Sequence, residues 1–220
     1  MKKKILLGLG ALALAIVTVP MFAAFEAHVI NVTATIENAL RVSTNEIAFG
    51  TVFPQEYLAK PLNISLTDSF IAETRVDDVA YVIKQKPKPR NPQDAEYCHS
   101  NNPIDRDNPN DDYYRLCYPV LCPYLSKEED KSPDNDEGLA SFHPIEAMTY
   151  GYLSKLAGDI SDEWLIDIDV PCFKGQCAQD WTHQGWELDP QWEHEVLGCD
   201  LWVEVTDIST STPISTSTPN

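Results

Sequence analysis

The sequence predicts an all-β protein, an antiparallel sandwich of jelly-roll type with a long insertion rich in cysteine and proline. Apolar residues recur along the chain with a period of two instead of 3.6, which is typical of half-buried strands. The apolar runs are short, and they end at proline, glycine or aspartate. The chain has 16 prolines and nine glycines, and each proline inside a helix costs about 3 kcal/mol. Two sheets that bury alternate side chains fit all three observations.

Length and charge limit the classes of function. The chain has 220 residues, 43% of them hydrophobic, and a formal charge of −18. A chain of this length forms one domain or two small ones and buries roughly 70% of its unfolded surface. Its 34 acidic residues outnumber its 16 basic ones, so it repels phosphate backbones, and we expect no nucleic-acid partner.

The first 24 residues have the pattern of an export signal. Three lysines, Lys2 to Lys4, precede an uncharged run that extends from Ile5 to Phe25. We expect a signal peptidase to remove residues 1–24, which leaves 196 residues with a formal charge of −21. The run is also close to the roughly 20 residues that span a bilayer, so a retained anchor is the alternative. The mature protein is expected to be secreted, extracellular or at the cell surface.

The jelly-roll domain is expected over residues 25–207, and its strands follow the alternation. In residues 28–36 four apolar side chains alternate with polar ones: Ile30, Val32, Ala34 and Ile36. The same pattern predicts strands over residues 62–66, 164–170 and 201–206. Further apolar runs cover residues 47–53 and 148–156.

An insertion is expected over residues 87–140, where the alternation stops. It contains prolines, acidic clusters and three of the six cysteines, so we expect a long connection that lacks its own core and has one short helix around residues 118–129. A second excursion, residues 178–198, carries Trp181, Trp186 and Trp192; packing in a small satellite core is the favoured reading, and a carbohydrate-stacking surface is the alternative. Residues 208–220 repeat Ile-Ser-Thr-Ser-Thr-Pro and predict an extended tail.

The six cysteines predict disulfides, because thiols oxidise outside the cytosol. Spacing does not determine their pairing, but we expect Cys98 to join Cys117 across an irregular loop. The partners of the other four stay open. No CxxC pair occurs, which counts against a zinc site. The six are Cys98, Cys117, Cys122, Cys172, Cys177 and Cys199.

The sequence contains no complete catalytic or metal-binding motif. His194-Glu195 begins a zinc-protease motif, but Gly198 stands where HExxH needs its second histidine. Asp134 and Asp136 resemble part of a calcium loop whose glycine and twelfth residue do not fit. We therefore expect no enzyme activity, no cofactor and no resident metal. The remaining histidines lack ligand spacing: His28, His99, His143 and His183.

Two stretches carry a resemblance to a known family. Residues 22–26, Phe-Ala-Ala-Phe-Glu, are followed by an alternating strand rich in threonine, and residues 47–54, Ile-Ala-Phe-Gly-Thr-Val-Phe-Pro, are followed by Gln55. The first resembles the start of the TasA/camelysin-like family of SipW-dependent exported proteins, which includes biofilm-matrix fibre proteins. The second is similar to that family's FGxVxPG-like turn, with Gln55 where glycine is common. The cysteine-rich insertion departs from the cysteine-free fibre protein.

The resemblance implies a filament subunit. It implies cleavage before Phe25, a jelly-roll fold and a head-to-tail homopolymer in which the freed N-terminal strand, residues 28–36, completes the sheet of the next copy. Cell-surface or matrix components are further candidate partners. Two alternatives remain open: a camelysin-like secreted metallopeptidase, and a monomeric surface adhesin or glycan-binding module. An N-terminal strand that pairs within its own subunit also remains open.

Overall fold

The computed structural model describes residues 34–100, 111–129 and 138–210. The chain divides into two units, residues 1–36 and 37–220, and all helices and strands described below belong to the second. Of the first unit, only residues 34–36 are described; they lie outside helices and strands and are exposed. No helix in the described ranges has the length and apolar character needed to cross a membrane.

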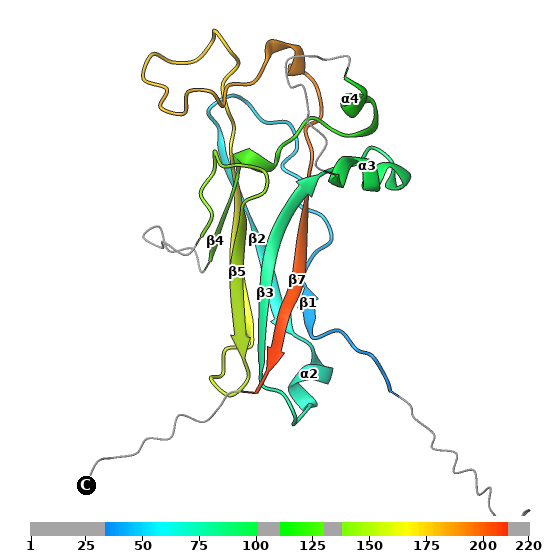
Figure 1. Ribbon diagram of the computed structural model, residues 1–220. Coiled ribbons are helices and arrows are strands. Elements are labelled where there is room, and N and C mark those ends of the chain that lie inside the picture. Colours follow the sequence, from blue (N-terminus) through cyan, green and yellow to red (C-terminus); the bar gives the residue numbers. More distant parts are fainter. Residues whose placement is uncertain (1–33, 101–110, 130–137, 211–220) are drawn as a thin grey trace, which may run out of the picture. The chain divides into compact units, whose positions relative to one another are not determined.

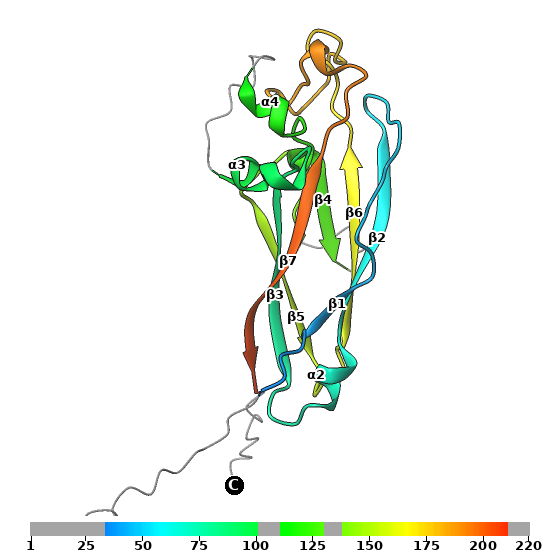
Figure 2. The same ribbon diagram turned by 90° about the vertical axis from the view of Figure 1, so that its right-hand side faces the viewer.

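The first sheet, sheet A, has four antiparallel strands in the order β1-β2-β6-β4. The long central pair is β2 (Tyr57–Leu66) and β6 (Ser161–Asp169), which pair from Tyr57 with Asp169 to Ser65 with Ser161. The short β1 (Leu40–Val42) pairs with the end of β2, and β4 (Leu125–Glu129) pairs with β6. Therefore β1 and β4 are the outer strands of this sheet (Figure 2).

The second sheet, sheet B, has three antiparallel strands in the order β5-β3-β7. The central strand is β3 (Asp78–Pro87), with β5 (Met148–Ser154) on one side and β7 (Cys199–Ser209) on the other (Figure 1). The register between β3 and β7 shifts after Ala80, which marks a bulge in the ladder.

Alternate side chains of the two sheets form the core between them. The main cluster combines Leu62, Ile64 and Trp164 of sheet A with Tyr81 and Leu153 of sheet B. A polar group also enters this core, because the Trp164 indole donates to the Tyr81 hydroxyl at 2.7 Å and that hydroxyl donates to Asp162. These contacts establish the antiparallel sandwich that the period-two pattern predicts.

Short helices connect the strands at several points. Helix α2 (Asp68–Ala72) begins at Thr67, whose hydroxyl accepts from the Phe70 amide at 3.2 Å. The carbonyls of Phe70 and Glu73 at its other end accept from the Lys155 ammonium. The remaining short helices are η2 (Pro92–Asp94), α3 (Ala95–His99), α4 (Asp112–Leu116), η3 (Cys122–Tyr124) and η4 (Pro190–Trp192).

The structure corrects several expected boundaries. The helix expected around residues 118–129 is wrong: one turn of 3₁₀ helix, η3, leads directly into the strand β4, which pairs with β6. Residues 87–140 therefore contribute a strand to sheet A and are not one long connection. The run at residues 47–53 forms no strand, and β7 continues to Ser209, two residues into the expected tail.

Three disulfides link the described cysteines, and none of these cysteines is free. Cys98 joins Cys117, as expected, and ties α3 to the end of α4 around a small cluster that includes Tyr113. Cys122 joins Cys199 across 77 residues of sequence, which connects η3 to the start of β7. Cys172 and Cys177 close a short loop after β6. These pairings resolve the alternatives that the spacing left open.

Candidate functional site: the open edge beside β7

Strand β7 is an outer strand of sheet B. In the described part of the chain it pairs with β3 on one side only. Next to the beginning of β7 the other side is covered. The Leu121 amide donates to the Gly198 carbonyl, and the Gly198 amide donates to the Pro119 carbonyl, each at 2.9 Å. Beyond that point its unpaired backbone groups are available to another strand.

The inward-facing side chains of β7 are poorly covered. Val205 pairs with Tyr81 and Ile208 pairs with Val79, and both partners are fully buried in the core, so Val205 and Ile208 face the space between the sheets. Nevertheless 42% of Val205 and 46% of Ile208 is exposed. Val42 on β1 is also more than one-third exposed. Core-facing side chains therefore remain partly exposed on the side of the sandwich where β1 and β7 are the outer strands.

The connection from β1 to β2, here called the crossing segment (residues 43–56), closes only part of this gap. Its ends are attached to sheet A: the Ser43 amide donates to Asn63 at 2.9 Å and the Gln55 amide donates to Val170 at 2.8 Å. Between these ends Ile47 and Phe49 pack on the core. No backbone hydrogen bond joins this segment to β7 among the described residues. Figure 2 shows it running between β7 and β2.

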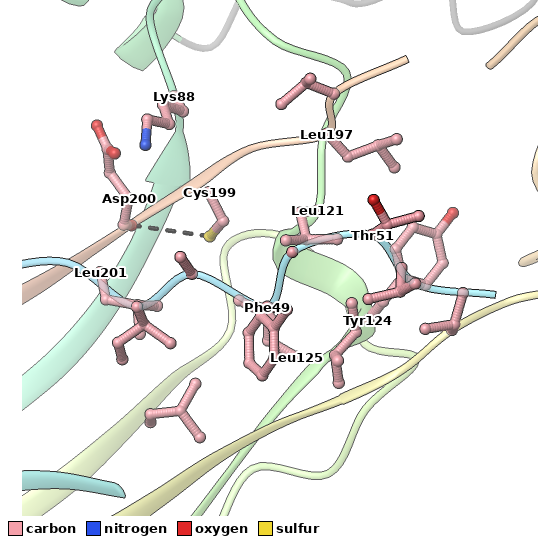
Figure 3. A pocket seen from close by; sticks show the side chains of 18 of the residues that line it. Phe49, Thr51, Lys88, Leu121, Tyr124, Leu125, Leu197, Cys199, Asp200 and Leu201 are labelled. Carbon is pink, nitrogen blue, oxygen red and sulfur yellow. Dashed lines mark hydrogen bonds between the residues drawn. The ribbon is translucent and has the colours of Figure 1, made fainter. Parts of the chain in front are cut away.

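A cavity of about 930 Å³ lies beneath the crossing segment. Its lining is mostly apolar and comes from both sheets and from the crossing segment, and it includes Phe49, Leu121, Leu125, Ile166, Leu201 and Val203. In Figure 3 the side chains of Phe49, Leu121 and Leu125 lie close together, and Leu201 approaches from β7. A pocket of this size and character accommodates apolar side chains.

One end of the cavity is polar. Lys88 and Asp200 lie there beside Cys199 (Figure 3). Burial raises the pKa of the Asp200 carboxyl above its usual range, while the nearby Lys88 and His99 act in the opposite direction. The end of the cavity near the start of β7 therefore carries a partly buried acid, Asp200, next to a base, Lys88. A partner that entered the cavity would have to offer polar groups to both.

The crossing segment ends in a tight turn. The Glu56 amide donates to the Phe53 carbonyl at 3.0 Å, so residues 53–56 form a turn with Pro54 and Gln55 at its centre. Gln55 has a φ of 67°, a left-handed conformation that glycine adopts without steric cost. Gln55 therefore stands at a position whose backbone conformation favours glycine.

The predicted donor strand falls largely outside the described residues. Ile30 and Val32 are not described, whereas Ala34 and Ile36 are exposed and belong to no strand, with 96% of Ile36 accessible to solvent. The acidic residues Asp134 and Asp136 also lie outside the described residues. The groove beside β7 was not predicted, because it depends on how the two sheets and the crossing segment are placed.

The histidines are dispersed. His194 lies in a loop with a φ of 68° and a side chain that is 92% exposed, and its nearest carboxylate is that of Glu193 at 3.9 Å. His99 packs edge-to-face on Trp202, and burial lowers its pKa. His143 is buried between the sheets. Throughout the described ranges no three His, Cys, Asp or Glu side chains gather as a metal site.

The three tryptophans of residues 178–198 contact other rings. Two pairs meet edge-to-face: the ring centroids of Trp186 and Tyr124 are 6.4 Å apart, and those of Trp181 and Phe142 are 5.6 Å apart. The ring centroids of Trp192 and Tyr114 are 4.5 Å apart. Each of the three is partly buried. These contacts agree with the interpretation of this excursion as a satellite core, in which rings cover one another under a long loop.

Comparison of the chain with protein-family models, with curated proteins and with solved structures gives no match.

Proposed function

We propose that this protein is an exported structural subunit that polymerises into extracellular filaments, each copy donating its N-terminal strand, residues 28–36, to the free edge of β7 in the next copy. The observation that carries the proposal is the exposure of Val205 and Ile208, which face inward at an unpaired edge. A donated strand would pair with β7 and cover these side chains in one step.

The number and spacing of apolar positions support this occupant. The donor segment places Ile30, Val32, Ala34 and Ile36 on one face at intervals of two residues. Beyond Cys199, which is bonded to Cys122, the inward-facing positions of β7 are four as well: Leu201, Val203, Val205 and Ile208, the last displaced by the bulge. Two antiparallel or parallel strands of this length bring such side chains into register on the same face. The described end of the donor segment, residues 34–36, is exposed.

The proposal also covers the type of sandwich, the cleavage site and the place of assembly. It takes the sandwich as a jelly roll of the TasA/camelysin-like kind, with cleavage before Phe25 and assembly outside the cell. The three disulfides support the choice of compartment, because such bonds persist in oxidising environments. Non-covalent assembly through a strand needs no catalytic group, so the proposed subunit is not an enzyme.

Electron microscopy of two purified versions of the protein tests this proposal. The mature chain beginning at Phe25 should form filaments, and a version that lacks residues 25–36 should stay monomeric while remaining folded. Filaments from both versions would exclude strand donation, and filaments from neither would favour the monomeric module.

A matched pair of substitutions tests the face of the donor strand. Val32→Asp places a charge on the apolar face and should abolish filaments, because a charge buried without a partner is costly. Thr33→Asp adds the same charge to the opposite face and should be tolerated. Equal effects of the two substitutions would contradict the proposed orientation.

A further inference from the structure

A chain of three polar side chains crosses the interior of the sandwich. The Lys127 Nζ on β4 donates to the Gln85 Oε1 on β3 at 2.7 Å. The Gln85 Nε2 is in turn 2.5 Å from the Nε2 of His143. Lys127 is completely buried, and Gln85 and His143 are each less than one-tenth exposed. The chain therefore links sheet A to sheet B in a place from which water is excluded.

The surroundings of the lysine are apolar. Lys127 pairs with Ile166 and Gln85 pairs with Leu201, so both side chains face the core between the sheets. Apart from Gln85, the only group that accepts from the Lys127 ammonium among the described residues is the Leu125 carbonyl at 3.5 Å. No carboxylate in these ranges forms an ion pair with it. A charged amine in such a place is expensive.

The protonation of both groups favours a neutral site. Burial lowers the pKa of Lys127 to about 7, so a large share of the amine carries a free electron pair at neutral pH, although the Asp167 carboxylate opposes the shift. Burial, together with the neighbouring Lys127, lowers the pKa of His143 to about 4. The His143 Nδ1 donates to the Ala140 carbonyl, which leaves Nε2 to accept from the Gln85 amide.

We propose that Lys127 and Gln85 form an intramolecular isopeptide bond that joins the two sheets covalently. The unprotonated Nζ attacks the side-chain carbonyl carbon Cδ of Gln85, and the new bond is Nζ–Cδ. The bond from Cδ to Nε2 breaks, and Nε2 leaves as ammonia after receiving the proton that Nζ gives up. The reaction consumes one amine and one carboxamide, produces one secondary amide and one ammonia, and needs no oxidant, reductant or nucleotide.

Three features of the site promote this reaction. The nucleophile and the carboxamide are held within hydrogen-bonding distance, which replaces a bimolecular encounter with a fixed approach. Burial prevents water from competing as the nucleophile. His143 orients the carboxamide by accepting a hydrogen bond from its nitrogen, and the proton that Nζ gives up passes directly to the departing Nε2. His143 thus acts as a positioning residue.

Mass spectrometry of the purified mature protein, reduced and alkylated, tests the proposal. The intact mass should be lower by one ammonia than the sequence requires. Trypsin should release residues 85–90 joined to residues 116–131, because a modified Lys127 is no longer a cleavage site and the prolines after Lys86 and Lys88 protect those bonds. Unmodified peptides 85–90 and 116–127, with the full intact mass, would overturn the proposal.

Variants locate the bond and provide a second readout. Lys127→Met should restore the full mass and should slow the reduced, denatured chain on a gel, because the loop from residue 85 to residue 127 is then open. Lys155→Met is the matched control: Lys155 is also largely buried, but it donates to backbone carbonyls, so this variant should retain the ammonia loss. His143→Gln should slow bond formation, which is followed by intact mass after synthesis. Loss of ammonia in Lys127→Met would overturn the assignment.

Discussion

Replacing Val205 and Ile208 with serine should weaken assembly while leaving the subunit folded. Both side chains face the interior, but each is a little less than half exposed in the free subunit. Their contribution to folding is correspondingly small, and under the proposed strand donation the rest of their surface is buried when a neighbour covers the β7 edge. The double variant therefore separates the stability of the subunit from the stability of the filament.

The expected magnitude follows from the exposed fractions. Full burial of a valine or isoleucine side chain is worth about 1.5–3 kcal/mol, and 42% and 46% of these two residues remain to be covered. Each side chain should thus contribute roughly 1 kcal/mol to the contact between subunits, and the pair about 2 kcal/mol. Because about 1.4 kcal/mol corresponds to a factor of ten, the critical concentration for assembly should rise roughly 30-fold.

Sedimentation of the mature protein over a range of concentrations measures the critical concentration, with electron microscopy of the pellet as a check on filament structure. Tyr150→Ser is the matched control. Tyr150 lies on the other face of sheet B, since it pairs with Val82 next to the inward-facing Tyr81, and it is 66% exposed. Its replacement should leave the critical concentration within about twofold.

Either of two results would contradict the proposed contact at β7. An unchanged critical concentration for the double variant would show that the exposed interior of β7 is not covered on assembly. An equal rise for Tyr150→Ser would show that the outer face of sheet B forms the contact instead. Urea denaturation of the monomers distinguishes both from simple unfolding, because the midpoints of the two variants should be similar.

Three further predictions concern the subunit itself. Gln55→Gly should raise the free energy of unfolding by about 1 kcal/mol in urea denaturation, since it relieves a residue with φ of 67°. Gly151→Ala should lower the free energy of unfolding by about 1–3 kcal/mol. A Cβ at this position would lie 2.1 Å from the Tyr81 ring, which is held in place because its hydroxyl accepts from Trp164. An unchanged denaturation midpoint would contradict this packing. Burial, and after it the Lys127 charge, lowers the pKa of His143 from 6.5 to about 4, so the unfolded chain binds more protons between these values. Stability should fall by up to about 3 kcal/mol as pH decreases from 6.5 to 4, and by less in a cross-linked subunit, whose Lys127 carries no charge. In His143→Gln this part of the pH dependence should disappear.

The sequence predicted those strands in which only one face is buried. In β2, β6 and β7 polar and apolar residues alternate clearly, and all three were identified within a few residues. The central strand β3 was missed. Its residues Val79 to Ile83 are apolar on both faces, with Val82 buried on the outside of sheet B, so a period of two is absent.

The strand β4 was missed for a different reason. Its sequence, Leu-Ser-Lys-Glu-Glu, has the composition of a solvated segment. Lys127 nevertheless faces the core, where its ammonium finds the Gln85 carboxamide on the opposite sheet. Sequence patterns do not contain such a contact, because its partner is 42 residues away. The open groove beside β7 was hidden in the same way, since it arises from the mismatch between a three-residue β1 and an eleven-residue β7.

The proposed bond and the proposed assembly bear on the same mechanical problem. In a filament joined by strand donation, tension enters each subunit at β7 and leaves through the chain before β1. The ladder between β3 and β7 is non-covalent, but the Cys122–Cys199 disulfide connects β7 to the segment that begins β4, and a Lys127–Gln85 bond would connect β4 to β3. Together these links would close a covalent ring through both sheets, so that force on β7 could not peel it from the sandwich. Filaments of Lys127→Met should then assemble with an unchanged critical concentration but break at lower force in single-filament stretching, whereas an equal rupture force would show that the cross-link has no role in bearing tension.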